Sequence, residues 1–323
     1  MRQRGLHENT INLIRDATSE VIKRSRYKGV QRQFLEWCKK NDQDFFTPNP
    51  VTVMNFLAAN FQSQHWKSTT VDTYKSQLLQ LYPGVTVFQQ DPEFNNFFKV
   101  LKANTIKDNT SITLDLQPIL SFLQGLPSNE DMEPVDLTRK LCWLLGVCAF
   151  LRPSDIARID LSLSGEVGSD IRLVIRRPKE KTNGVHTDKV KFLKPHPNIP
   201  ALCPVLTYQA YVKRLVGKEL QHPHDTNPHL KYNPLVRRLQ EPDIPIGADR
   251  IRNHIKAIMS MLDLPEGATV PKARAVGATQ AAMRGASLDD IITHGSWASK
   301  AMFQNFYRLS SSTSSNFTKI VLG

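Results

Sequence analysis

The chain has 323 residues, which is long enough for about two domains and a sizeable core. Its 42 Lys and Arg residues outnumber 30 Asp and Glu residues, and the formal charge of +12 favours a polyanionic partner, nucleic acid ahead of an anionic membrane surface. Four scattered cysteines without Cys-x-x-Cys spacing and nine histidines without a metal-binding motif indicate neither a disulfide framework nor a metal site.

No segment of the sequence is suited to membrane insertion. The longest apolar run, Leu141 to Leu151, is too short to cross a bilayer. The first residues, Met1-Arg2-Gln3-Arg4, do not lead into the apolar core of a signal peptide. We therefore expect an intracellular protein without a membrane partner, whose cysteines are reduced and buried.

Residues up to 106 show the apolar spacing of amphipathic helices separated by polar breaks, without strand-like alternation. Helices are expected from about Lys23 to Lys40, after Pro50, from Ser68 and after Pro92. Basic side chains on such helices can neutralise DNA phosphates, although an ordinary helical domain with a charged surface would show the same pattern. The sequence predicts a helical domain over residues 1–106.

A polar stretch of low helix propensity then separates two apolar patterns, so a linker is predicted at residues 107–114. The second domain is expected over residues 115–323, with a C-terminal tail from residue 310. It opens with a helix from Leu116 to Leu123. A second helix, from Leu137 to Leu151, is apolar nearly all round and should therefore be buried.

An arginine stands at the exit of that buried helix. Pro153 is suited to open the next helix, and Asp155 lies three residues after Arg152, so the carboxylate can orient the guanidinium. A purely structural ion pair would have the same spacing.

The period changes to two after residue 170. Ile171, Leu173 and Ile175 alternate with polar residues, and Val185, Val190 and Phe192 suggest a return strand, with Thr182-Asn183-Gly184 as the turn. Seven basic residues decorate this hairpin: Arg176, Arg177, Lys179, Lys181, Lys189, Lys191 and Lys194. Such a hairpin can insert one lysine into a site or simply bind phosphates. The fold is expected to be mainly α with a small β-hairpin or sheet.

Two more helices are expected before residue 263. One begins at Pro204, and the other runs from about Ala248 to Leu262 with His254 in a structural position. A polar loop between them contains His222, His224 and His229, which have no further metal ligand near them in the sequence.

The last part of the chain contains the sharpest signals. Small residues make a helix that starts beside Arg274, Gly285 suits its C-terminal end, and Ser287 suits the N-cap of the next helix, which ends at Gly295. The segment from Lys300 to Arg308 places Met302, Phe303 and Phe306 on one side, with Tyr307 next to that stripe. A tyrosine in this position is often only a packing residue.

The order of an arginine at 152, a hairpin lysine, an arginine at 274, Trp297 and Tyr307 resembles the tyrosine recombinase family, which shares its catalytic plan with type IB topoisomerases. Phe-Leu-Arg-Pro-Ser-Asp-Ile, Gly-Ala-Ser-Leu-Asp-Asp-Ile-Ile and Phe-Tyr-Arg look most like the eukaryotic transposon branch, the Crypton and DIRS-like recombinases. The likeness covers most of residues 115–310. It implies a helical core-binding domain followed by an α+β catalytic domain.

The resemblance also implies roles for these residues in a reaction that needs no metal or other cofactor. Tyr307 would be the nucleophile that forms a 3′-phosphotyrosine, because tyrosine can hold the DNA strand covalently while the bond energy is conserved. Two guanidiniums are wanted for the charge on the phosphate. The remaining roles follow by position: Arg152 and Arg274 as the clamp, Lys179 with Lys181 as its rival for protonating the leaving 5′ oxygen, Trp297 as an indole donor, and Asp155 as a supporting carboxylate.

The sequence departs from the family at one position. The family often has histidine three residues before the second arginine, and here that residue is Pro271. Lys272 beside it, or His294 three residues before Trp297, would have to take over its contact.

Double-stranded DNA is the partner that the resemblance implies, with self-association to a dimer or tetramer in which the apolar tail 316–322 docks on a neighbour or packs back on its own domain. Integration or excision of a mobile element and a nuclear location are implied in the same way. A noncatalytic, domesticated DNA-binding protein is the main alternative, and a monomeric relaxing enzyme is a weaker one.

Overall fold

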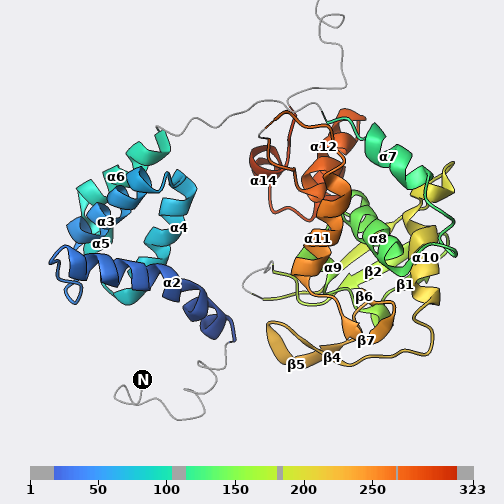
Figure 1. Cartoon of the computed structure of the whole chain (residues 1–323), viewed down its shortest axis with the longest axis horizontal. Coiled ribbons are helices and arrows are strands. Elements are labelled where there is room, and N and C mark those ends of the chain that lie inside the picture. Colours follow the sequence, from blue (N-terminus) through green and yellow to red (C-terminus); the bar gives the residue numbers. More distant parts are fainter. Residues whose placement is uncertain (1–17, 104–113, 180–184, 267, 311–323) are drawn as a thin grey trace, which may run out of the picture. The chain divides into compact units, whose positions relative to one another are not determined.

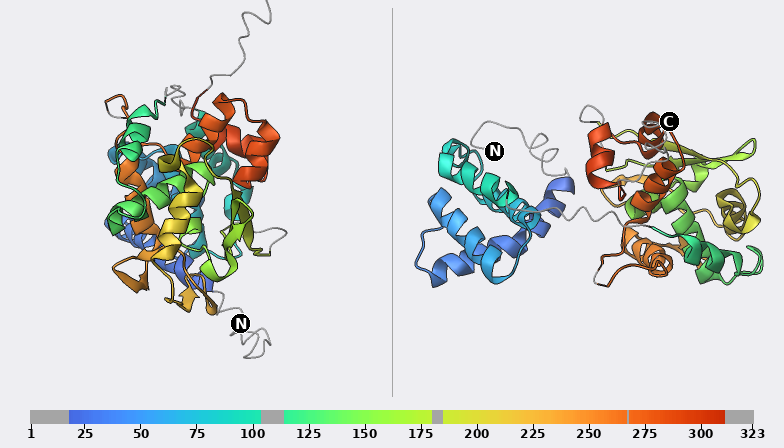
Figure 2. Two further views of the ribbon diagram at one scale, coloured as in Figure 1. Left: turned by 90° about the vertical axis from the view of Figure 1, so that its right-hand side faces the viewer. Right: turned by 90° about the horizontal axis from the view of Figure 1, so that it is seen from above.

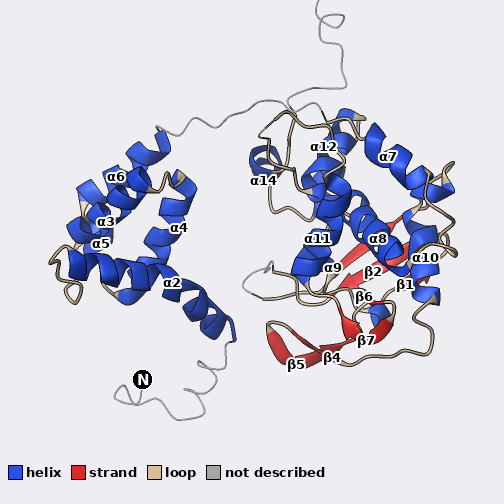
Figure 3. Ribbon diagram, viewed as in Figure 1, coloured by secondary structure: helices blue, strands red, loops and turns tan. Residues whose placement is uncertain are grey.

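The computed structural model of the chain describes residues 18–103, 114–179, 185–266 and 268–310, with side chains from residue 27 onward. The chain divides into two compact units, residues 1–109 and 110–323 (Figure 1). The predicted linker falls mainly on residues 104–113, outside the described residues. In the described part of the chain, strands occur in the second unit alone (Figure 3).

The first unit is a set of helices (Figure 2) that pack around an aromatic core. Its elements are α2 (Thr18–Lys40), α3 (Pro50–Ser63), α4 (Ser68–Leu78), α5 (Val87–Gln90) and α6 (Pro92–Ala103). The core holds Phe34, Phe56 and Phe94. The predicted helices are confirmed, and the first begins at Thr18, about five residues before the expected start. The start of α3 has local causes. Asn49 Oδ1 accepts the Val51 backbone N–H at 2.9 Å, and Pro50 at the first helical position has no backbone N–H that would be left without an acceptor.

The second unit is built around one buried helix, α8 (Pro134–Cys148), which packs against three others. These are α10 (Pro204–Lys213), α11 (Ala248–Met259) and α12 (Ala273–Met283). A shorter helix, α7 (Gln117–Gln124), also contributes to its core. The predicted burial of α8 is confirmed, but the helix ends at Cys148 instead of Leu151. Phe150 has φ +52, a left-handed conformation that stops the helix before Arg152.

A three-stranded antiparallel sheet completes this core, in the order β1 (Gly165–Val167), β2 (Asp170–Ile175) and β3 (Lys189–Leu193). The predicted hairpin is therefore confirmed, with β1 as a strand that the sequence pattern did not indicate. The expected turn at 182–184 lies outside the described residues.

The return strand turns a lysine toward the core and two apolar side chains toward solvent. Val190 and Phe192 are exposed, whereas Lys191 is only 4% exposed and lies opposite Leu173. Since side chains alternate along a strand, the register that buries Leu193 must also turn Lys191 inward. The lysines of β3 consequently do not form a uniformly solvated basic surface.

The histidine-containing segment is also not the loop that the sequence suggested. It forms two antiparallel ribbons, β4 (His222–His224) with β5 (Asn227–Tyr232), and β6 (Arg237–Arg238) with β7 (Glu241–Pro245). Within the described ranges, no group of His, Cys, Asp and Glu is placed to hold a metal ion. No helix among those residues has the length and apolar character needed to cross a membrane.

The C-terminal helices follow the predicted punctuation. Ser287 Oγ accepts the Asp290 backbone N–H at the start of α13 (Leu288–Gly295), and Gly285 has φ +88. The last helix, α14 (Lys300–Phe306), buries Phe303. The predicted three-residue stripe is wrong in part, because Met302 and Phe306 are exposed and Tyr307 lies just beyond the helix end.

Candidate active site

Tyr307 lines a cavity of about 500 Å³ in the second unit. The segment that leads into α9 (Pro153–Ile156), the start of α12 and one side of α11 form its walls. The basic side chains that line it are Arg152, Arg252, Lys256, Lys272 and Arg274. The cavity thus combines one tyrosine with an excess of cations.

Asp155 holds Arg152 in place beside Tyr307. The Arg152 backbone N–H donates to Asp155 Oδ2 at 3.2 Å, and Arg152 Nη1 lies 3.8 Å from the same oxygen. Asp155 is completely buried. Arg152 Nη2 then donates to the Tyr307 hydroxyl oxygen at 3.3 Å. A short helix that starts at Pro153 therefore gives the guanidinium both its anchor and its direction.

Arg274 occupies the second position of α12 and is 3% exposed. Its Nη2 donates to the Gly295 carbonyl at 2.5 Å. Its guanidinium carbon lies 4.7 Å from the centre of the Trp297 ring and 4.8 Å from the centre of the Tyr307 ring. The two aromatic rings are themselves 4.8 Å apart. This contact places the second positive charge directly against the tyrosine.

Gly295 leaves the space that the Trp297 indole occupies. A Cβ atom at Gly295 would lie 2.1 Å from Trp297 Cε3, so only glycine allows the indole to lie over this backbone. The next residue, Ser296, adopts φ +50 and turns the chain from α13 toward Trp297. The indole also stacks on Phe150 at 5.9 Å. Trp297 is consequently held between Phe150 and Tyr307.

The backbone of Tyr307 is fixed by Thr279 of α12. Thr279 Oγ1 donates to the Tyr307 carbonyl at 3.1 Å and accepts the Leu309 N–H at 3.0 Å. Partial burial raises the pKa of the Tyr307 hydroxyl, but the Arg274 charge and the hydrogen bond and charge of Arg152 outweigh it, so this pKa is lowered from its ordinary value of 10.0. The site therefore eases the loss of the hydroxyl proton that gives the phenolate, the nucleophilic form of tyrosine.

Lys179 and His294, both singled out in the sequence, do not line this cavity. Lys179 is exposed after β2 and is not among the residues that line it, and its rival Lys181 lies outside the described residues. His294 lines a different cavity of about 650 Å³, and its Nε2 donates to the Cys148 carbonyl at 2.6 Å. Pro271 and Lys272, in contrast, both line the Tyr307 cavity. Of the two candidates for the lost histidine contact, the structure places only Lys272 there.

Two hairpin lysines other than Lys179 and Lys181 support the site from β3. Lys189 Nζ lies 3.8 Å from Asp155 Oδ2, the oxygen that orients Arg152. Lys191 Nζ donates to the His294 carbonyl and, at 2.7 Å, to Ser296 Oγ. It therefore holds the turn that carries Gly295. The period of two that buries Leu193 was the signal that could have placed both lysines inward.

The environment of His294 has a consequence for stability. Burial lowers the pKa of its imidazole, the bond to Cys148 opposes this, and the Lys191 charge adds to the lowering. Because the folded pKa lies below the ordinary value of 6.5, the neutral ring contributes stability that is present above pH 6.5 and is lost as the pH falls through the folded pKa.

We expect His294→Gln to flatten this pH dependence. Glutamine can still donate to the Cys148 carbonyl but does not titrate, so the slope of unfolding free energy below pH 6.5 should fall by up to about 1.4 kcal/mol per pH unit. Urea unfolding at several pH values measures the slope. Replacing the exposed His229 by Gln is the control, and an unchanged slope in His294→Gln would contradict the assignment.

The fold is shared with integrases of known structure. An integrase of the Tn1549 transposon bound to transposon right end DNA has 15% identity, covers 92% of this chain and 93% of its own, and gives a TM-score of 0.53. The same integrase with circular intermediate DNA gives 14% identity, 86% and 85% coverage and a TM-score of 0.52. A lambda integrase dimer bound to a core site has 12% identity, covers 95% of this chain and 90% of its own, and gives a TM-score of 0.52.

Sequence comparison adds nothing to this likeness, since no protein-family model and no curated protein sequence matches the chain. The structural likeness extends over most of both proteins in each pair. With its small antiparallel sheets and mainly helical content, the chain has the α+β fold of the tyrosine recombinase integrases.

Proposed function

We propose that the chain is a site-specific DNA recombinase that cuts and rejoins DNA strands through a 3′-phosphotyrosine at Tyr307. The observation that carries this proposal is the pair of guanidiniums on one tyrosine. Arg152 hydrogen-bonds its hydroxyl oxygen, and Arg274 lies against its ring. A structural tyrosine needs one hydrogen-bond partner, whereas two cations with a lowered hydroxyl pKa suit a nucleophile that attacks a phosphodiester.

The chemistry follows from that geometry. The Tyr307 hydroxyl loses its proton to solvent and its oxygen forms a bond to phosphorus. The bond from phosphorus to the 5′ oxygen breaks, and the leaving oxygen takes a proton. Arg152 and Arg274 stabilise the charge on the nonbridging oxygens, and Trp297 adds an indole N–H. The cavity itself offers Lys272 as proton donor, and the hairpin offers Lys179. The phosphotyrosine conserves the bond energy for rejoining.

Charge and likeness support a DNA partner. The formal charge of +12 suits a polyanion, and the Tn1549 and lambda integrases with the same fold are DNA complexes. Our proposal includes assembly to a dimer or tetramer on DNA through the tail 316–322, integration or excision of a mobile element, and a nuclear location. The motifs around Arg152 and Tyr307 favour the eukaryotic transposon branch.

The experiment uses nicked duplexes whose short fragment diffuses away after cleavage, drawn from a randomised or element-derived pool. We expect a covalent protein–DNA adduct that survives denaturation and forms in the presence of a chelator. Peptide mass spectrometry should locate the DNA on Tyr307. DNA binding without an adduct across the pool would overturn the enzyme and favour a noncatalytic DNA-binding protein, the alternative motivated by Pro271 at the cavity wall.

Lys191 provides a prediction about how the site is held. Lys191→Met keeps the length of the side chain but removes its bonds to the His294 carbonyl and Ser296, so the turn that carries Gly295 and Trp297 loses its anchor. We expect the rate of adduct formation to fall about 100-fold while the Kd for DNA is unchanged. Lys194→Met, an exposed lysine just after β3, is the matched control. A wild-type rate in Lys191→Met would show that the anchor is dispensable.

A further inference from the structure

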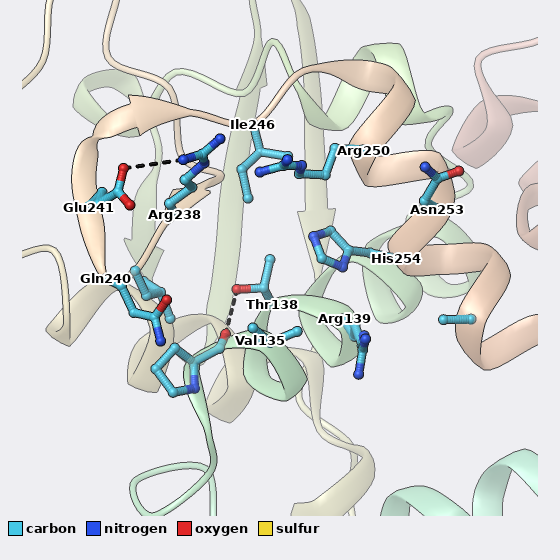
Figure 4. A pocket seen from close by; sticks show the side chains of 13 residues that line it. Val135, Thr138, Arg139, Arg238, Gln240, Glu241, Ile246, Arg250, Asn253 and His254 are labelled. Atoms are coloured by element: carbon cyan, nitrogen blue, oxygen red, sulfur yellow. Dashed lines mark hydrogen bonds and ion pairs between the residues drawn. The ribbon is translucent and has the colours of Figure 1, made fainter.

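A second cavity of about 500 Å³ lies on the other side of α11 from Tyr307. Its walls are the first turns of α8, the β6–β7 ribbon and α11 (Figure 4). Arg250 and His254 of α11 line this cavity, whereas Arg252 and Lys256 of the same helix line the Tyr307 cavity. The two cavities are thus separated by one helix and share no lining residue.

Three arginines from three different elements line this second cavity. They are Arg139 of α8, Arg238 of β6 and Arg250 of α11. In Figure 4, Arg250 extends from α11 toward Arg238, and the His254 ring points into the space beside them, whereas the Arg139 side chain is directed away from both. The fold, not sequence proximity, brings Arg238 and Arg250 toward each other. Their mutual repulsion makes an anion favourable at this place.

The carboxylates nearby do not neutralise the cluster. Glu241 is the acidic residue among those that line the cavity, and its Oε2 lies 3.2 Å from Arg238 Nη1. Asp136 Oδ1 lies 2.9 Å from Arg139 Nη1. Both pairs are three residues apart and open to solvent, a geometry worth little energy. In the described part of the chain, the buried Nε of Arg139 has no hydrogen-bond partner.

The positive charges at this cavity also affect the imidazole of His254. Burial lowers the pKa of its imidazole, and the charges of Arg139 and Arg250 lower it further. The ring is therefore neutral at pH 7 and can donate one N–H to an anion without a charge of its own. Bound negative charge would oppose the two arginines and raise this pKa.

We propose that this cavity binds a phosphate group. A tetrahedral phosphate presents oxygens in several directions and can meet the Arg238 and Arg250 guanidiniums and the His254 ring together, whereas a planar carboxylate presents two oxygens in one plane. The phosphate belongs either to a free polyphosphate or to a DNA backbone, since both offer the same oxygens. The site does not depend on Tyr307 or on strand cleavage.

The test uses the full chain with inorganic pyrophosphate and follows His254 by NMR, its signal assigned with His254→Gln. We expect pyrophosphate to raise the pKa of His254 and to bind measurably by calorimetry. The double variant Arg238→Gln/Arg250→Gln should bind about 100-fold more weakly, about tenfold for each guanidinium. Both side chains are partly or fully exposed, and a melting curve checks that the fold is kept. Lys231→Gln, an exposed lysine on β5, should bind like the wild type.

A nonspecific duplex oligonucleotide in place of pyrophosphate separates the two sources. If the duplex produces the same shift at His254, the phosphate is that of a DNA backbone. If pyrophosphate alone produces it, the natural ligand is a free polyphosphate. An unchanged His254 pKa with both probes, or equal pyrophosphate affinity in the folded double variant, overturns the proposal.

Discussion

Tyr307→Phe should abolish the covalent adduct while leaving the protein folded and bound to DNA. The change removes one oxygen atom, so the ring contacts with Trp297 and Arg274 remain. Without that oxygen no bond to phosphorus can form, and we expect the rate to fall by a factor on the order of 10⁴ or more. Denaturing electrophoresis of labelled nicked duplexes measures the adduct, and fluorescence anisotropy measures the Kd.

The control for this variant is Tyr208→Phe, which removes the same atom from a buried tyrosine of α10 outside the Tyr307 cavity. It should form the adduct at the wild-type rate. An adduct that persists in Tyr307→Phe would assign the nucleophile to another residue. A loss of DNA affinity in Tyr307→Phe would mean that the hydroxyl serves binding, and the proposed chemistry would lose its main support.

Gly277→Ala should destabilise the second unit by about 3 kcal/mol, at the upper end of the usual cost of overpacking. A Cβ atom at Gly277 would lie 2.0 Å from the Val147 carbonyl oxygen and 2.9 Å from the Val147 Cα. These are backbone atoms of α8, so no side chain can move aside and the two helices must separate. Because α12 carries Arg274 and Thr279, we also expect the adduct to form more slowly.

Thermal unfolding measures this effect, with a decrease in Tm of about 10 °C expected for a unit of this size. Gly165→Ala in β1 is the matched control, because no atom lies within 4 Å of a Cβ atom there. Its Tm should be nearly unchanged. If Gly277→Ala melted with the wild type, α8 and α12 would be able to separate at little cost, and the close approach at Gly277 would not hold Arg274 in place.

Local signals in the sequence located most helix starts. Pro50, Pro153 and Ser287 each act within one helical turn, either by lacking a donor that would be unsatisfied or by accepting a nearby N–H. For the same reason, the contact between Arg152 and Asp155 could be foreseen from a spacing of three. Interactions of this range are encoded in neighbouring residues and do not depend on the remainder of the fold.

The sequence did not predict the contacts between residues far apart in the chain. His294 and Lys179 had suitable chemistry for the site, but α13 directs the imidazole to the Cys148 carbonyl, and Lys179 stays at the surface. Lys191, which the sequence did not single out among the hairpin lysines, is buried and binds the His294 carbonyl, 103 residues further along the chain. Neither outcome could be read from residue type.

The sequence by itself determined the helical class, the hairpin and the order of the residues that gather at Tyr307, because periodicity, capping and basic charge act locally or through composition. Only the tertiary structure decided which cations reach the tyrosine and which anchor the turn beside it. The positions of Arg274 and Lys191 depend on the close approach of α12 to α8 and on the register of β3, which are set by the packing of the whole unit.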